Sequence, residues 1–95
     1  MLGIHEAKYI GNYNLFLVFN NGKEGTANLE GTIFSDTRAI FSQLKDESIF
    51  KNFKVDHNTV IWSDELDIAP EYLFYLAFKE DTAFQDQFKQ WGYIA

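Results

Sequence analysis

The densest group of side chains with chemical potential is the acidic segment Asp64-Glu65-Leu66-Asp67, which Glu71 follows four residues later. Carboxylate oxygens are the ligands that Mg²⁺ and Ca²⁺ prefer. A metal-assisted small-molecule enzyme would therefore use this cluster, Asp64 to Glu71, to hold its ion. The segment lacks the alternating acids and central glycine of a calcium loop. Because acids also suit the start of a helix, we expect a solvated turn followed by a helix.

Other residue types that support catalysis are scarce. His5 and His57 are the only histidines, and the chain has no cysteine to act as a nucleophile or zinc ligand. No serine stands in a nucleophile elbow, and Gly22-Lys23-Glu24-Gly25 is typical of a hairpin rather than of a phosphate-binding loop. The sequence predicts no catalytic residue, no metal ligand and no cofactor. We therefore expect a protein that is not an enzyme.

Length and charge limit the partners. The 95 residues predict a single domain over 1–95, and 14 acids against 8 bases give a net charge of −6. An acidic surface repels phosphate backbones, so we expect no nucleic-acid partner, whereas a more basic protein would be attracted. Lys45, Lys51 and Lys54 lie near phenylalanines, as in RNA-binding sheets, but the net charge opposes this hypothesis.

The same composition predicts a location. The N-terminal segment has no basic patch followed by an apolar run, so we expect no signal peptide. No apolar stretch approaches the roughly 18–20 residues that cross a bilayer. Small secreted domains usually depend on disulfides, which this chain cannot form. We expect a cytoplasmic protein with no membrane association.

The first third of the chain predicts a three-stranded antiparallel meander. Residues 6–10 and 23–29 flank the run 15–19, which is apolar on both faces, as in a strand covered on each side. Asn20-Asn21-Gly22 is a strong hairpin signal because Asn and Gly tolerate positive φ. Gly25 interrupts the third strand, as is acceptable in an outer strand.

In the middle third of the chain, the spacing of apolar residues changes from the period of a strand to that of a helix. Ser35 or Asp36 is suited to cap a helix in which apolar residues recur at helical spacing (Ala39, Ile40 and Leu44). A short helical turn over 46–50 is expected to direct three apolar side chains inward (Ile49, Phe50 and Phe53). A second hairpin follows over 53–62, with its turn at Asp56-His57-Asn58.

The last third predicts helices. Pro70 suits the first turn of a helix whose segment from Tyr72 to Phe78 is apolar nearly all round. Thr82 and Gln85 fit a capping box, and Gly92 fits a C-terminal cap. The predicted fold is α+β, with a small antiparallel sheet of about four or five strands, covering short helices and a helical C-terminus.

The aromatic residues of these C-terminal helices are the candidate protein-interaction surface, because aromatic side chains are enriched at interfaces. The alternative is that they pack on the sheet, since the chain carries ten Phe, five Tyr and two Trp. The candidate residues are Tyr72, Tyr75, Phe78, Phe84, Phe88, Trp91 and Tyr93.

The order of several motifs over residues 4–76 resembles the bacterial domain of unknown function 2442 family. The motifs are Leu15 to Lys23, Ile33-Phe34, Phe41 to Asp46 leading to Phe50, Val55-Asp56, Val60-Ile61-Trp62 and Leu66 to Leu73. Ser63-Asp64-Glu65 departs from the Pro-Asn-Gly that many relatives carry, and 77–95 form an additional C-terminal helix.

The resemblance implies a small α+β fold with no assigned activity and no catalytic residues to transfer. Members are often encoded beside a second small uncharacterised protein, which suggests toxin–antitoxin pairs, and some carry a helix-turn-helix domain that is not seen here. We therefore expect a non-catalytic protein-binding module, the antitoxin-like member of such a pair. Its expected partner is a basic protein encoded by an adjacent gene, with a homodimer as the alternative.

Overall fold

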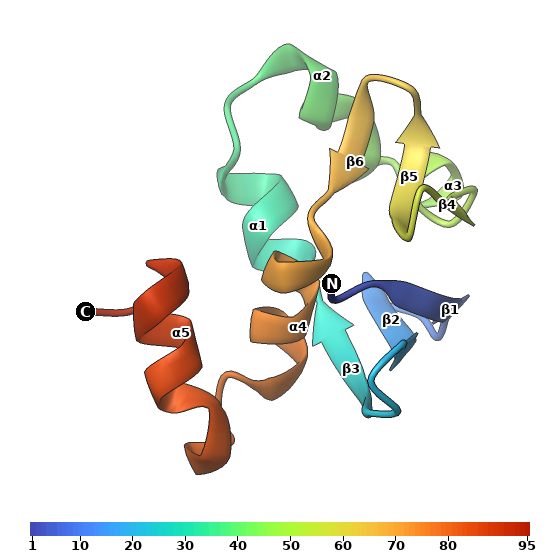
Figure 1. Ribbon diagram of the computed structural model, residues 1–95. Helices are drawn as coiled ribbons and strands as arrows, with labels where there is room; N and C mark the ends of the chain where they lie inside the picture. The colour runs from blue at the N-terminus through green and yellow to red at the C-terminus, as the bar shows by residue number, and fades with distance from the viewer.

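The structure, a computed structural model, describes the backbone of residues 1–95 and every side chain except that of Ile40. Over this described chain, the strands form two three-stranded antiparallel sheets, joined and covered by short helices (Figure 1). The predicted α+β class is therefore confirmed. The strands number six among the described residues, in two sheets rather than one.

The first sheet is the predicted meander, in the order β1 (Ile4–Tyr9), β2 (Asn14–Phe19) and β3 (Glu24–Asn28). Burial alternates along β2: Leu15, Leu17 and Phe19 are buried, whereas the residues between them are only half-buried. The expectation that both faces of this strand would be covered is therefore wrong. One face of β2 packs against the core, and the opposite face is partly exposed to solvent.

The two hairpin turns of this sheet have different chemistry. At the β2–β3 turn, the Gly22 N–H donates to the Phe19 carbonyl, and Gly22 has a φ of +85°, as the sequence predicted. At the β1–β2 turn, Asn12 and Tyr13 have φ values of +54° and +65°. A bulky residue such as Tyr13 rarely adopts this left-handed backbone. Its hydroxyl donates to the carbonyl of Lys45, which connects the turn to the helical segment in the middle of the chain.

The second sheet contains β4 (Lys54–Asp56), β5 (Thr59–Ser63) and β6 (Leu66–Ile68). The predicted hairpin is confirmed as β4–β5. Strand β6 was missed because its acidic surroundings were interpreted as a turn and a helix start. Leu66 and Ile68 are buried and Asp67 is exposed, which is the alternation of a half-buried strand. The Ile4 N–H donates to the Asn58 carbonyl and links the two sheets.

Short helices connect the sheets: α1 (Glu30–Ser35), α2 (Ala39–Ser42), the 3₁₀ turn η1 (Gln43–Lys45) and α3 (Glu47–Phe50). Helix α1 was not predicted. The proposed cap at Ser35 or Asp36 is wrong, because Arg38 occupies the cap position of α2. Asp46 does cap α3, since its side chain accepts from the Ser48 N–H at 2.9 Å.

The inward positions predicted in this segment are confirmed in part. Leu44 and Phe50 are fully buried, and Phe53 is half-buried. Ile49 is 39% exposed, so the expectation that it points inward is wrong. The side chain of Ile40, an apolar position of the predicted helix, lies outside the described side chains.

Helix α4 (Pro70–Phe78) lies between the first sheet and α5 (Gln85–Trp91), which the 3₁₀ turn η2 (Thr82–Phe84) precedes (Figure 1). Pro70 begins α4 and Gly92 ends α5 with a φ of +85°, both as predicted. The predicted capping box is displaced by one residue. Asp81 caps η2, and the Gln85 amide donates to the Asp81 carbonyl at 2.7 Å instead of reaching Thr82.

Gly25 allows α4 to approach β3. A Cβ atom at this position would lie 3.0 Å from Cζ of Phe78 and 3.3 Å from Cβ of Ala77. Real Cβ atoms seldom come so close to their neighbours, so a side chain would displace the Phe78 ring. The glycine therefore serves helix–sheet packing, not merely tolerance in an outer strand.

Gly25→Ala should lower the free energy of unfolding by about 1–3 kcal/mol, because the new methyl group overpacks the α4–β3 contact. Gly31→Ala is the matched control. A Cβ at Gly31, in helix α1, meets nothing within 4 Å, so alanine should stabilise by up to ~1 kcal/mol through its helix propensity. Urea unfolding of both variants measures the two effects, and equal signs would contradict the packing argument.

Candidate binding groove

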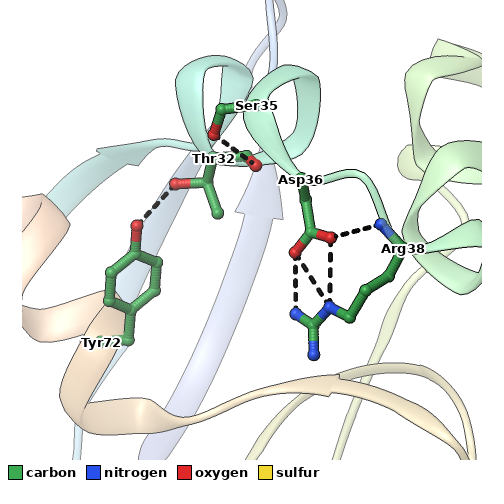
Figure 2. Close-up of polar contacts among 5 residues, drawn as sticks. All are labelled: Thr32, Ser35, Asp36, Arg38 and Tyr72. Atoms are coloured by element: carbon green, nitrogen blue, oxygen red, sulfur yellow. Dashed lines mark hydrogen bonds and ion pairs between the residues drawn. The ribbon is translucent and has the colours of Figure 1, made fainter.

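The candidate site is a groove between α1 and α4, positioned by one interhelical hydrogen bond. The hydroxyl groups of Thr32, on α1, and Tyr72, in the first turn of α4, lie 2.7 Å apart and point toward each other (Figure 2). Both residues line two separate hollows, one at either side of this bond. We call the two hollows together the α1–α4 groove.

The first hollow has a volume of about 280 Å³ and the second about 360 Å³. Both lie near the lower end of the size range of ligand pockets. The first is lined by Thr32, Asp36, Arg38, Phe41, Asp67, Ile68, Ala69 and Tyr72. The second is lined by Asn28, Gly31, Thr32, Ser35, Tyr72, Tyr75, Leu76 and Lys79.

An ion pair lies at the first hollow, just beyond the end of α1. Arg38 Nη2 lies 2.7 Å from Asp36 Oδ2, and the Arg38 backbone N–H donates to Oδ1 at 2.9 Å (Figure 2). The hydrogen bonds from the Arg38 side chain, followed by the one from its backbone, lower the pKa of Asp36 below its ordinary value. The carboxylate is therefore held in its charged form.

Three tyrosines gather beside the second hollow. The ring of Tyr75 stacks on that of Tyr93 at a centroid distance of 5.1 Å, and Tyr72 lies 5.5 Å from Tyr93. All three side chains are half-buried. Burial, followed by the charge of Glu71, raises the pKa of the Tyr93 hydroxyl. We call Tyr72, Tyr75 and Tyr93 the tyrosine cluster.

The remaining candidate interface residues pack around Phe74. Phe88 is fully buried, so it contributes nothing to a surface. The rings of Phe78, Phe84 and Trp91 lie 4.6, 5.0 and 6.1 Å from that of Phe74, and all three are half-buried. Phe84 and Trp91 therefore lie in the aromatic layer between α4 and α5, and Phe78 also packs against the first sheet. The tyrosine cluster, in contrast, borders the groove.

The acidic segment does not form a converging site. Across the described residues, no group of three or more His, Asp or Glu side chains is arranged to hold a metal ion. Asp67 lines the first hollow and Glu71 stands in the first turn of α4, whereas Asp64 and Glu65 lie in the exposed β5–β6 turn. The acids that the metal-assisted alternative would use are thus divided between a hollow, a helix start and an exposed turn.

Neither histidine joins the groove. His5 lies exposed on β1, and His57 lies in the β4–β5 turn with Nε2 3.9 Å from Asp56 Oδ2. Among the helices that the structure describes, none has the length and apolar character needed to span a bilayer.

Sequence reasoning missed most of the groove because it missed α1. Thr32 and Ser35 come from this helix, and Asp36 and Arg38 follow it directly. The available signal was Leu29 and Ile33, two fully buried apolar residues at the i, i+4 spacing of one helix face. The sequence identified Tyr72 and Tyr75 as interface candidates and Asp67 as part of the acidic segment, and it assigned Ser35 and Asp36 only a capping role.

A model for the family described as "protein of unknown function (DUF2442)" matches residues 4–79. The chain belongs to this family. The DUF2442 match includes both sheets and α4, and therefore every residue that lines the groove, whereas α5 lies beyond it. No curated protein matches this DUF2442 chain.

A solved structure shares the fold of this DUF2442 chain. The crystal structure of a putative DNA-binding protein from Nitrosomonas europaea ATCC 19718 superimposes with a TM-score of 0.69 at 12% sequence identity. The match covers 95% of this chain and 61% of that one, so this chain spans about three fifths of the length of that protein. At this identity the likeness shows the fold alone.

This neighbour corrects one expectation from the sequence. The exclusion of nucleic-acid partners on the basis of net charge is wrong, because the fold occurs in a protein described as a putative DNA-binding protein. The net charge of −6 is a sum over the whole surface. It does not fix the charge of any single face, and it says nothing of an attached segment.

The Thr32–Tyr72 bond should be measurable as a coupling. Thr32→Val and Tyr72→Phe each remove one hydroxyl, and a double-mutant cycle should give a coupling free energy of about 0.5–1.5 kcal/mol. Tyr75→Phe combined with Thr32→Val is the control, because Thr32 bonds Tyr72 and not Tyr75. A coupling near zero in the first cycle would show that this bond does not hold α1 against α4.

Proposed function

We propose that this chain is a non-catalytic protein-binding module that receives a segment of its partner in the α1–α4 groove. The observation that carries the proposal is the pair of adjoining hollows of about 280 and 360 Å³, bordered by the tyrosine cluster. Tyrosine combines a large apolar ring with a polar tip, which suits a surface that alternates between solvent and a partner. Two hollows divided by Tyr72 fit two neighbouring side chains of one segment.

Charge supports a basic partner. The groove and its border carry three carboxylates, from Asp36, Asp67 and Glu71, against the cations of Arg38 and Lys79. The net charge of the groove is therefore negative, and so is that of the whole chain, at −6. Complementary charge raises the association rate and disfavours acidic competitors.

A finer form of the proposal is an antitoxin-like role, in which the partner is a small basic protein encoded by an adjacent gene. A homodimer is the alternative occupant of the groove. Co-expression and co-purification with the adjacent gene product separate these outcomes. If the pair never associates, and co-expression changes no growth phenotype, the antitoxin-like role fails.

A substitution that fills the second hollow tests the groove. Gly31 is exposed and has open space at its Cβ position, so Gly31→Arg adds bulk and positive charge without disturbing the core. It should weaken capture of the basic partner about tenfold or more, as measured by calorimetry. Thr26→Arg is the control, with the same charge change on an exposed position of β3.

The two variants give separable outcomes. Thr26 alternates with Gly25 and Ala27, which face α4 and the core, so its side chain lies on the opposite face of the sheet. Equal weakening by both variants would indicate a non-specific charge effect. No weakening by Gly31→Arg would place the partner elsewhere and overturn the groove as the interface.

DNA association is a second candidate function, favoured by the description of the structural neighbour. On this chain, the exposed Lys51 and Lys54 flank Phe53, whose ring lies against Trp62 at 6.4 Å. Lysines supply the phosphate contacts of such binding. This group is the best match on the chain for a contact with a nucleic-acid backbone.

Mobility-shift titration of duplex DNA measures this candidate. Binding should weaken with salt, and Lys51→Glu with Lys54→Glu should reduce the slope of log K against log salt by about 0.9 for each lost phosphate contact. Lys23→Glu with Lys89→Glu, in the β2–β3 turn and on α5, makes the same total charge change at exposed positions and is the control. Absence of any retardation at low salt would remove the candidate for this chain.

A further inference from the structure

The first hollow already holds a guanidinium group. Arg38 donates from Nε to both carboxylate oxygens of Asp36, at 3.1 and 3.2 Å, and from Nη2 to Oδ2 at 2.7 Å (Figure 2). The guanidinium carbon lies 4.4 Å from the ring centroid of Phe41. A carboxylate fork beside an aromatic face is the combination that recognises arginine, through paired hydrogen bonds and cation–π attraction.

This internal ion pair is one that an incoming group can replace. Arg38 is separated from Asp36 by a single residue, and its side chain is 68% exposed, against 17% for Asp36. Exposed ion pairs contribute little to stability because water and salt screen them. The acceptor is therefore the sheltered member of the pair, and the donor is the accessible one.

Asp67 offers a second, solvent-exposed acceptor. Asp67 lines the same hollow from β6, and among the described side chains no hydrogen bond or ion pair engages its carboxylate. The hollow thus carries two carboxylates and one guanidinium, which leaves one negative charge without a counterpart. The hollow therefore favours a further cation. It disfavours an anion, because the charge of Arg38 is already neutralised by Asp36 and because Asp67 would repel the anion.

We infer that the first hollow is a binding site for an arginine side chain of a basic partner segment, and that Arg38 is an internal competitor that occupies Asp36 in the free protein. The incoming guanidinium displaces Arg38 from Asp36, rests between Phe41 and Tyr72, and gains Asp67 as a second acceptor. Lysine fits less well because its point charge cannot form the paired contact. The inference rests on the proposed function and names the partner chemistry of that groove.

Short peptides test the site directly. The probe is acetyl-Gly-Arg-Gly-amide, compared with the same peptide carrying lysine or uncharged citrulline, in an amide chemical-shift titration of the full chain. The arginine peptide should shift resonances over residues 32–41 and 67–72, with an affinity about fivefold or more above that of the lysine peptide. Citrulline should produce no such shifts.

Variants with opposite expected signs distinguish the proposal from general electrostatics. Asp36→Asn and Asp67→Asn should each weaken arginine-peptide binding about fivefold or more, since each removes a charged acceptor. Arg38→Ala should strengthen binding several-fold by removing the competitor. Lys89→Ala, on α5 and outside both hollows, deletes the same positive charge as Arg38→Ala and should change binding much less. The amide spectrum of each variant verifies that it is folded.

Three results overturn the proposal: equal binding of arginine and lysine peptides, shifts located away from the first hollow, or weaker binding by Arg38→Ala. The last result would indicate that Arg38 itself contacts the ligand. If Gly31→Arg blocks partner capture while the arginine peptide fails to bind, the protein-binding function stands and this inference fails. If the peptide binds but Gly31→Arg leaves capture intact, the arginine site stands and the proposed groove interface fails.

Discussion

The packing of α4 against its two neighbours is the constraint on which the rest of the structure depends. The ring of Phe74 lies 5.0 Å from that of Phe19 in the first sheet and 6.3 Å from that of Phe88 in α5. Edge-to-face contacts of this kind fix the relative position of the elements that they join. Because α4 is held on both sides, its first turn presents Tyr72 to α1. The groove is therefore a consequence of the core rather than a feature of flexible loops.

Features governed by local interactions could be predicted from the sequence, and those that depend on distant partners could not. The Asn20-Asn21-Gly22 hairpin, Pro70 and Gly92 each satisfy a backbone requirement within a few residues, and all three were placed correctly. Helix α1 contains Gly31 and Thr32, which have low helix propensity. It forms because Leu29 and Ile33 are buried in the core, which is a tertiary effect that local patterns do not reveal.

The acidic segment shows how one pattern can serve two structures. Asp64, Glu65 and Asp67 were interpreted as a solvated turn and a helix start, and the first two do lie in a turn. Asp67 belongs instead to β6, where it faces outward between two buried residues. Three residues are too few for alternation to be distinguished from a helix start. The same limit applies to charge, because a sum over the chain does not locate the carboxylates that gather at one hollow.

The left-handed backbone at Tyr13 has a consequence for how the first hollow is built. An unfavourable backbone conformation persists only where contacts with the surrounding structure outweigh its cost in free energy. Here the ring contacts those of Phe34 and Phe50, and the hydroxyl is bonded to the Lys45 carbonyl. The β1–β2 turn thus holds η1, which directly follows α2 and its Phe41. Replacing Asn12-Tyr13 by Asn-Gly would relax the backbone but would also remove these contacts of the Tyr13 side chain. The segment that places Phe41 in the lining of the first hollow would then be held less firmly.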